Sequence, residues 1–298
     1  MISIRRKAQL HVALVIVLPA LGTCAAMARA QQRGIHALQL GLFAAMYAVT
    51  LLGITVGYHR YFTHGAFKTS PFIARTLAIW GSMAGYGPLV YWAAIHRMHH
   101  RFEDSPGDPH SPYFHGERAL GRLSGFFHAQ LAWTWRHPVP DTLHYAKDLL
   151  KDARARGWSE RYLYFFMLGF LVPAGIGGAL GGVDGTIDGL LWGGMVRLCV
   201  TYHFGLATGS FAHLFGSRPF HMPRGHSANN LFIALINFGE GWHQNHHAFP
   251  TAASFGIGAA QLDLGALFIR TLAMLGLAWD VKTVSSASLD SKRMEPAS

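Results

Sequence analysis

The chain has 298 residues, of which 51% are apolar and only 13% are charged. Soluble domains usually carry about 25% charged residues, so this composition favours a membrane protein. The net charge is +10, but the basic residues form neither a long stripe nor a nucleic-acid motif, so we expect no nucleic-acid partner. We attribute the excess of basic residues to loops that set the orientation of the chain in a membrane.

Several apolar stretches of the chain are candidates for membrane helices. Four of them are long enough to cross or nearly cross a bilayer, which takes about 20 residues. They cover residues 11–28, 37–56, 162–180 and 190–206. A further apolar stretch, residues 71–92, is interrupted by glycines and a proline. We expect it to form a buried or re-entrant helix.

The first apolar stretch has a second interpretation. Basic residues 5–7 precede it, and residues 28–30 resemble a small-residue cleavage site, which together are typical of a secretory signal peptide. We favour a membrane span, because the apolar run is long for a signal peptide and a second span follows after a short loop.

The distribution of basic residues predicts the orientation. Residues 181–188 contain no Lys or Arg and should lie outside, which places residues 57–161 and the C-terminal third inside. Arg29 and Arg33 fall on the outer side, against this rule. We therefore expect an all-α integral membrane protein in a bacterial inner membrane, with both termini and the active site cytoplasmic. Residues 1–284 should form one domain, with a stem of four membrane helices, a helical cap (57–161 and 207–284) and a disordered tail (285–298).

Three clusters of histidine carry the chemistry. Two of them share one spacing, with histidine at i, i+3 and i+4, and the first is shorter. The clusters are His59 and His64; His96, His99 and His100; and His243, His246 and His247. On a helix, residues at i, i+3 and i+4 lie on one face, whereas successive residues diverge by about 100°. One helix can therefore supply ligands to two neighbouring ions.

A metal accounts for this crowding, because imidazoles packed together must be held neutral. Eight imidazoles are more than one ion takes, so we expect two ions. Imidazole suits iron, zinc and copper, and the spacing does not choose among them. A pair of ions held by many imidazoles fits O2 chemistry better than a hydrolytic zinc site, which uses three or four ligands. We expect the other histidines, His110 among them, to be structural or to lie behind the ligands, where they would contact the ligating residues and not the metal.

These clusters, in this order after paired membrane spans, resemble the membrane fatty-acid desaturases of the acyl-CoA (stearoyl-CoA delta-9) type, in a bacterial-like form. The resemblance covers about residues 53–282. It rests on Gly57-Tyr58-His59-Arg60, Asp108-Pro109-His110-Ser111, His213-Leu214-Phe215-Gly216, Asn229-Asn230 and Gly239-Glu240-Gly241-Trp242, together with the histidine clusters.

The resemblance implies two iron ions in the cap and one more ligand, His213, which makes nine histidine ligands. It implies O2 as co-substrate, an acyl chain in an apolar tunnel, and electrons from a separate carrier of the ferredoxin, rubredoxin or cytochrome b5 type. The sequence has no haem domain, no flavin or dinucleotide fingerprint and no ferredoxin cysteine set that would replace that carrier. Trp92 and Trp242, each near a histidine cluster, are candidates for the tunnel wall, with ordinary packing as the alternative.

Several positions depart from the family pattern, and they bear on the acyl carrier and on the reaction outcome. The family usually has Asn, holding a water on one iron, at the position of Gly209. Its Asp-x-Ser-Arg-Asn-Asn run begins here with Gly225. Animal enzymes have an Arg-Asp pair that helps hold coenzyme A where this chain has Ala94 and Ile95. The acyl carrier is therefore open between coenzyme A, an acyl-carrier protein and a membrane lipid.

The expected function is O2-dependent desaturation of a saturated fatty acyl chain near its middle, as in delta-9 desaturation. An acyl-chain hydroxylase, or an enzyme that forms a terminal alkene or alkyne on the same site, is the nearest alternative. A membrane metal transporter or haem protein is more remote, because the histidines cluster at span ends and the spans hold few polar residues.

Overall fold

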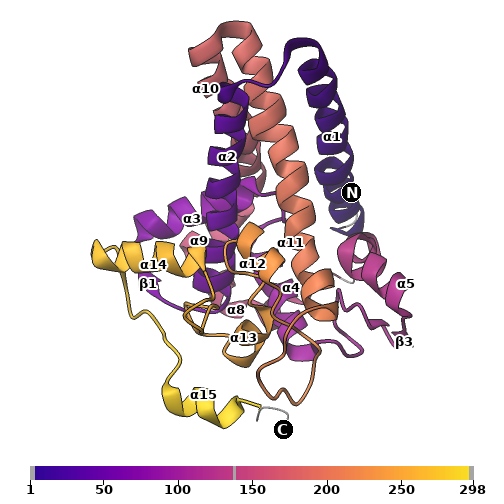
Figure 1. Cartoon of the computed structure of the whole chain (residues 1–298), viewed down its shortest axis with the longest axis vertical. Helices are drawn as coiled ribbons and strands as arrows, with labels where there is room; N and C mark the ends of the chain where they lie inside the picture. The colour runs from indigo at the N-terminus through magenta and orange to yellow at the C-terminus, as the bar shows by residue number, and fades with distance from the viewer. Residues whose placement is uncertain (1–3, 137–138, 295–298) are drawn as a thin grey trace.

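The structure is a computed structural model that describes residues 4–136 and 139–294. A stem of long helices lies at one end and a cap of short helices at the other (Figure 1). The stem consists of α1 (Ile4–Arg33), α2 (Ala37–Leu52) with its π-helical continuation η1 (Gly53–Thr63), α10 (Tyr162–Asp188), the π-helical segment η3 (Gly189–Val196) and α11 (Arg197–Leu214).

The cap contains the remaining elements. Its helices are α3 (Pro71–Met83), α4 (Leu89–Phe102), α5 (Arg122–Phe127), η2 (His128–Ala132), α6 (Trp133–Arg136), α7 (Thr142–Tyr145), α8 (Lys147–Lys151), α9 (Ala153–Glu160), α12 (Leu231–Ile236), α13 (His243–Ala248), α14 (Leu264–Met274) and α15 (Ser286–Lys292). Short strands form two antiparallel pairs, β1 (Lys68–Thr69) with β4 (Ala278–Trp279) and β2 (Phe114–His115) with β3 (Arg118–Ala119). The pair β1–β4 ties the start of the cap to its C-terminal part.

Within the described ranges, three helical runs are long and apolar enough to cross a membrane: Gln9–Arg33, Ala37–Thr63 and Tyr162–Leu214. The third has 53 residues and is not straight, because Gly181 and Gly182 leave helical geometry inside it. Gly182 has a φ of +60°, which a residue without a side chain adopts at little cost. The run folds back at this point, and the stretches 162–180 and 190–206 lie in its two arms (Figure 1).

Small residues let the two arms approach closely. A Cβ added at Gly177 would collide with the backbone of Gly185, and one added at Gly189 would collide with the backbone of Pro173. Glycine at helix contacts of this kind allows close backbone packing where no hydrophobic effect drives helices together.

Arg29 and Arg33, which conflict with the basic-residue rule, are paired with acids. Arg29 lies 2.6 Å from Asp184 and 2.9 Å from Asp188, and Arg33 lies 2.6 Å from Asp184. These ion pairs join the end of α1 to the turn between the two arms. The charge of each arginine is therefore compensated locally by residues of the same end of the stem.

Arg197 anchors the cap to the stem from a fully buried position at the start of α11. Its guanidinium donates to the carbonyl oxygens of Met83 at 2.8 Å, Gly169 at 2.8 Å and Gly193 at 3.1 Å. Met83 is the last residue of α3, so its carbonyl has no partner within the helix. The arginine thus satisfies a helix end that is buried away from water.

The expected break within residues 71–92 lies between α3 and α4. Gly85 and Gly87 have φ values of +82° and +93°, so the chain turns here in a conformation that side chains disfavour. Ser70 caps the start of α3 by accepting a hydrogen bond from the N–H of Ile73. The break separates α3 from α4, which carries the second histidine cluster.

The C-terminal segment differs from the expected disordered tail. Residues 286–292 form α15, which is capped by the hydroxyl of Ser285. Its last residue, Lys292, donates to the carbonyl of Ala248 at 2.7 Å and lies over the ring of Phe249. Contacts with residues next to the third histidine cluster therefore order a segment whose polar composition suggests disorder. Residues 295–298 of the expected tail lie outside the described residues.

Candidate metal centre

The structure brings all nine predicted histidines together in two groups. His59 lies in η1 and His64 directly follows it, the second cluster comes from α4, His213 from the end of α11 and the third cluster from α13. The five-histidine group consists of His59, His64, His96, His100 and His246, and the four-histidine group consists of His99, His213, His243 and His247. The adjacent histidines of α4, His99 and His100, thus belong to different groups, and so do the adjacent histidines of α13. The spacing predicts this result, because successive side chains of a helix point in different directions.

The π-helical form of η1 explains how His59 and His64 reach one group. The N–H of His64 donates to the carbonyl of His59, five residues earlier, at 3.2 Å. A helix with this wider turn brings residues five apart closer to one face than an α-helix does. Periodicity in an α-helix gives no signal for the wider turn.

Within each group the Nε2 atoms converge. In the five-histidine group, Nε2 of His246 lies 2.9 Å from Nε2 of His59 and 2.9 Å from that of His100. In the four-histidine group, Nε2 of His243 lies 2.9 Å from that of His213 and 3.1 Å from that of His247. Several imidazole nitrogens facing one another cannot all be hydrogen-bonded pairs. A cation between them accounts for the arrangement, and the residues fit a metal.

Carboxylates fix the orientation of four of these rings. Nδ1 of His59 donates to Glu240 at 2.6 Å. The corresponding distances are 3.0 Å from His99 to Asp108, 2.8 Å from His213 to Asp104 and 2.8 Å from His247 to Glu103. A proton on Nδ1 leaves Nε2 with its lone pair, so each carboxylate turns a ligand nitrogen toward the centre of its group.

The sequence interpretation did not assign these carboxylates. Asp108 and Glu240 belong to motifs that carry the family resemblance, and Glu103 and Asp104 lie three and four residues after His100, the end of the second histidine cluster. Ligating histidines usually donate a hydrogen bond from their second ring nitrogen to a carboxylate or carbonyl. Acidic residues this close to a predicted ligand cluster could therefore have been identified from the sequence as partners of the histidines.

Gly225, one of the departures from the family pattern, lies against Glu103. A Cβ added at Gly225 would collide with the carboxylate of Glu103. The next residue, His226, donates its N–H to Asp104 at 2.8 Å. The carboxylate of Glu103 therefore fills the space that a side chain at position 225 would enter. The φ of +85° at Gly225 also disfavours any side chain there.

Burial lowers the pKa of seven of the nine clustered imidazoles and so favours their neutral form. It lowers the pKa of His99 to about 3, because desolvation opposes the charged ring. Desolvation, followed by repulsion from neighbouring imidazoles, lowers the pKa well below the usual value in His64, His96, His100, His243, His246 and His247. The neutral ring is the form that binds a metal, so these side chains are ready to coordinate at neutral pH.

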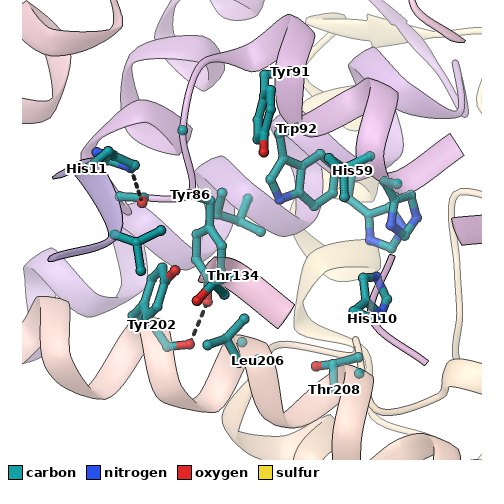
Figure 2. Close-up of a pocket in the computed structure, with 18 of the residues that line it drawn as sticks. His11, His59, Tyr86, Tyr91, Trp92, His110, Thr134, Tyr202, Leu206 and Thr208 are labelled. Carbon is teal, nitrogen blue, oxygen red and sulfur yellow. Dashed lines mark hydrogen bonds between the residues drawn. The ribbon is translucent and has the colours of Figure 1, made fainter. Parts of the chain in front are cut away.

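A cavity of about 590 Å³ borders both groups (Figure 2). Its wall includes His59 and His96 from one group and His99 and His243 from the other. The remaining wall is mainly apolar and aromatic, and it includes Leu10, Tyr86, Tyr91, Trp92, Tyr202 and Leu206. An apolar ligand in this cavity would lie against both histidine groups.

The two predicted wall residues differ in position. Trp92 borders the cavity and stacks on His96, with ring centroids 5.0 Å apart and an interplanar angle of 10°. Trp242 is not among the residues that border the cavity. It packs with Ala234 and Phe255 and donates its indole N–H to the carbonyl of Leu262 at 2.8 Å. The observed contacts of Trp242 correspond to the packing alternative, because its side chain packs within the cap and its indole N–H is hydrogen-bonded there.

Gly209 borders the cavity beside His110. A Cβ added at Gly209 would come to 3.4 Å from Nδ1 of His110, which is an ordinary contact distance. The ring of His110 lies against that of His99, with centroids 4.2 Å apart. The position where the family usually has Asn is thus empty of side-chain atoms, and an imidazole stands next to it. The contact of His110 with His99 agrees with the expectation that it is structural or lies behind the ligands.

Comparison with known proteins agrees with this geometry. The family model for fatty acid desaturase matches residues 35–270. The chain is 40% identical to a hex-5-enoyl-[acyl-carrier protein] acetylenase of Moorena producens, over 95% of this chain and 89% of that enzyme. It is 31% identical to an sn-1 stearoyl-lipid 9-desaturase of Synechocystis sp., over 85% of this chain and 74% of that enzyme. It is 33% identical to an icosanoyl-CoA 5-desaturase of Limnanthes douglasii, over 81% of this chain but 64% of that enzyme.

Apolar helices that can cross a membrane, and histidine groups at an apolar cavity, define a membrane protein with a candidate metal site. The chain belongs to the fatty acid desaturase family, and it is an oxidoreductase of the fatty-acyl desaturase kind. The family is the one expected from the histidine clusters, and it is not a family of metal transporters or haem proteins.

Proposed function

We propose that the chain uses O2 and external electrons to desaturate a fatty acyl chain at two iron ions. One ion would be held by the five-histidine group and the other by the four-histidine group. The observation that supports this most is the convergence of nine imidazoles in two groups, each of which borders an apolar cavity through two of its histidines. Bound iron would supply the activation of O2 that removal of hydrogen from an unactivated methylene requires.

The chain's own residues would position the substrate and exclude water. Trp92, stacked on His96, would press the acyl chain toward the ligands, and the aromatic wall would keep the cavity dry. Glu240 would hold His59 in its ligating orientation, and it would itself be held by the hydroxyl of Thr55. The electron donor would be a separate protein of the ferredoxin, rubredoxin or cytochrome b5 type.

We further propose four membrane crossings, with the third and fourth in the two arms of the run Tyr162–Leu214. Both termini and the histidine groups would be cytoplasmic, and residues 181–188 would lie outside a bacterial inner membrane. The N-terminal end of α1 and the helix α15 both lie toward the cap, which supports this orientation (Figure 1).

A second outcome on the same site is the formation of a triple bond. The similarity to an acetylenase that acts on an acyl-carrier-protein substrate favours this candidate. It also favours an acyl-carrier protein over coenzyme A or a lipid as the carrier, and the absence of the Arg-Asp pair at Ala94 and Ile95 is consistent with it. An alkyne would form if the enzyme removed two further hydrogens from a chain that already holds a double bond.

Expression in a bacterial host that lacks its own desaturase tests both outcomes. We expect new unsaturated acyl chains in the mass-spectrometric profile, and none from a His99→Ala variant expressed at the same level. Alkynyl chains would assign the second outcome. A profile containing only hydroxylated chains would refute both desaturation and triple-bond formation.

A further inference from the structure

The two histidine groups differ in the acids that support them. Three carboxylates contact rings of the four-histidine group: Glu103 at His247, Asp104 at His213 and Asp108 at His99. Among the described residues, a single carboxylate, Glu240, contacts a ring of the five-histidine group. All four acids are buried, so little solvent screens their charges.

Nearby cations increase this difference. Nη2 of Arg60, which is fully buried, lies 3.8 Å from Glu240 and offsets part of its charge, although Asp263 pairs with the same guanidinium. Arg97 lies near His64, where its charge opposes a cation, and it is paired with Asp148. On the other side, Arg218 donates to the backbone carbonyl of His213, but solvent screens its exposed charge.

We propose that the two metal sites are unequal, and that the four-histidine group binds the more tightly held divalent cation and fills first. This inference rests on the proposed function, because it assumes that both groups hold ions. Four imidazoles already complete a tetrahedral shell around an ion. The fifth imidazole of the other group therefore adds less to the affinity for the ion than each of the first four. Each supporting carboxylate changes metal affinity about 10–100-fold, and the four-histidine group has two more of them.

The test is a titration of the full-length, metal-free protein in detergent with Co²⁺, followed by visible absorption. We expect two binding steps, with the first at least about tenfold tighter than the second. His243→Ala should remove the tight step, whereas His64→Ala should remove the weak step and leave the tight one. These two histidines are a matched pair, since in the described structure neither contacts a carboxylate through Nδ1.

Carboxylate variants then assign the cause. Glu103→Gln should weaken the tight step about 10–100-fold and leave the weak step unchanged, and Glu240→Gln should weaken the weak step alone. Asp104→Asn serves as a second variant on the tight side, and circular dichroism establishes that each variant is folded. Two equal steps, or a tight step lost in His64→Ala, would overturn the inference while leaving the proposed function intact. A folded chain that binds no cation would overturn the proposed function as well.

Discussion

His59 donates from Nδ1 to Glu240 at 2.6 Å, across 181 residues of the chain. The contact joins the first histidine cluster on η1 to the turn that leads into the third cluster on α13. The candidate ligand shell is therefore assembled from distant parts of the sequence, and carboxylates orient four of its nine rings. This arrangement governs what ligand substitutions should do.

We predict about two iron ions per chain in the purified protein. His99→Ala and His246→Ala should each lose iron, and turnover should fall at least about hundredfold, because an ion loses a ligand. Elemental analysis and a product assay measure the two effects. His221→Ala is the control, since that side chain is exposed and lies outside both groups. One ion, or none, in active unaltered protein would contradict the two-site interpretation.

Gly209→Asn should change the partition between products. If an amide at this position holds a water beside the metal, we expect the variant to raise the ratio of desaturated to hydroxylated product. Gly209→Ala, which adds only a methyl group at an ordinary distance from His110, should leave the ratio unchanged. Products from a deuterated acyl substrate, separated by mass spectrometry, give the ratio. An unchanged ratio in both variants would show that Gly209 does not affect the outcome.

Trp92→Leu should weaken substrate binding. The indole borders the cavity and stacks on His96, and its loss removes apolar contact worth about 1–3 kcal/mol. We expect the KM for the acyl substrate to rise about tenfold, with iron content preserved. Trp135→Leu is the control, because that side chain is 37% exposed and does not border the cavity. A KM that stays the same in Trp92→Leu would place the acyl chain elsewhere.

The topology can be tested with reporters. A fusion after residue 298 should report the cytoplasm, and a cysteine at Gly182 should react with a membrane-impermeant thiol reagent added from outside. Gly182 suits this test because a Cβ there meets no atom within 4 Å. Because Gly182 has a positive φ, a cysteine at this turn would strain the backbone slightly. A periplasmic C-terminus, or cleavage after residue 30, would reverse the orientation that we propose.

Removal of the metal should make the protein sensitive to acid. Burial lowers the pKa of His99 from 6.5 to about 3, so between these values the unfolded chain binds a proton that the folded chain does not. The stability of the metal-free protein should therefore fall as the pH drops below about 6.5. The midpoint of thermal unfolding of the metal-free protein in detergent, at about pH 7.5 and about pH 5.5, measures this change in stability. The reference is His221→Ala, which should show the same dependence on pH as the unaltered protein. An equal or higher midpoint at the lower pH would contradict the burial argument.

The sequence by itself determined the membrane character, the long apolar helices and the nine histidines that meet at the candidate site. Long apolar runs predict membrane helices because a bilayer demands length and apolarity, which are local properties. The spacing i, i+3, i+4 predicts which histidines share a face, and the family resemblance adds His213. All of these residues meet in the structure.

Only the tertiary structure decided how these parts combine. The division of the histidines into groups of five and four, the carboxylates behind them and the inward packing of Trp242 depend on contacts between distant segments. The wider turn of η1 and the ordering of α15 likewise arise from packing, which overrides local composition and periodicity. Local sequence sets the type of each element, whereas the chemistry of the site depends on which side chains long-range packing brings within a few ångströms.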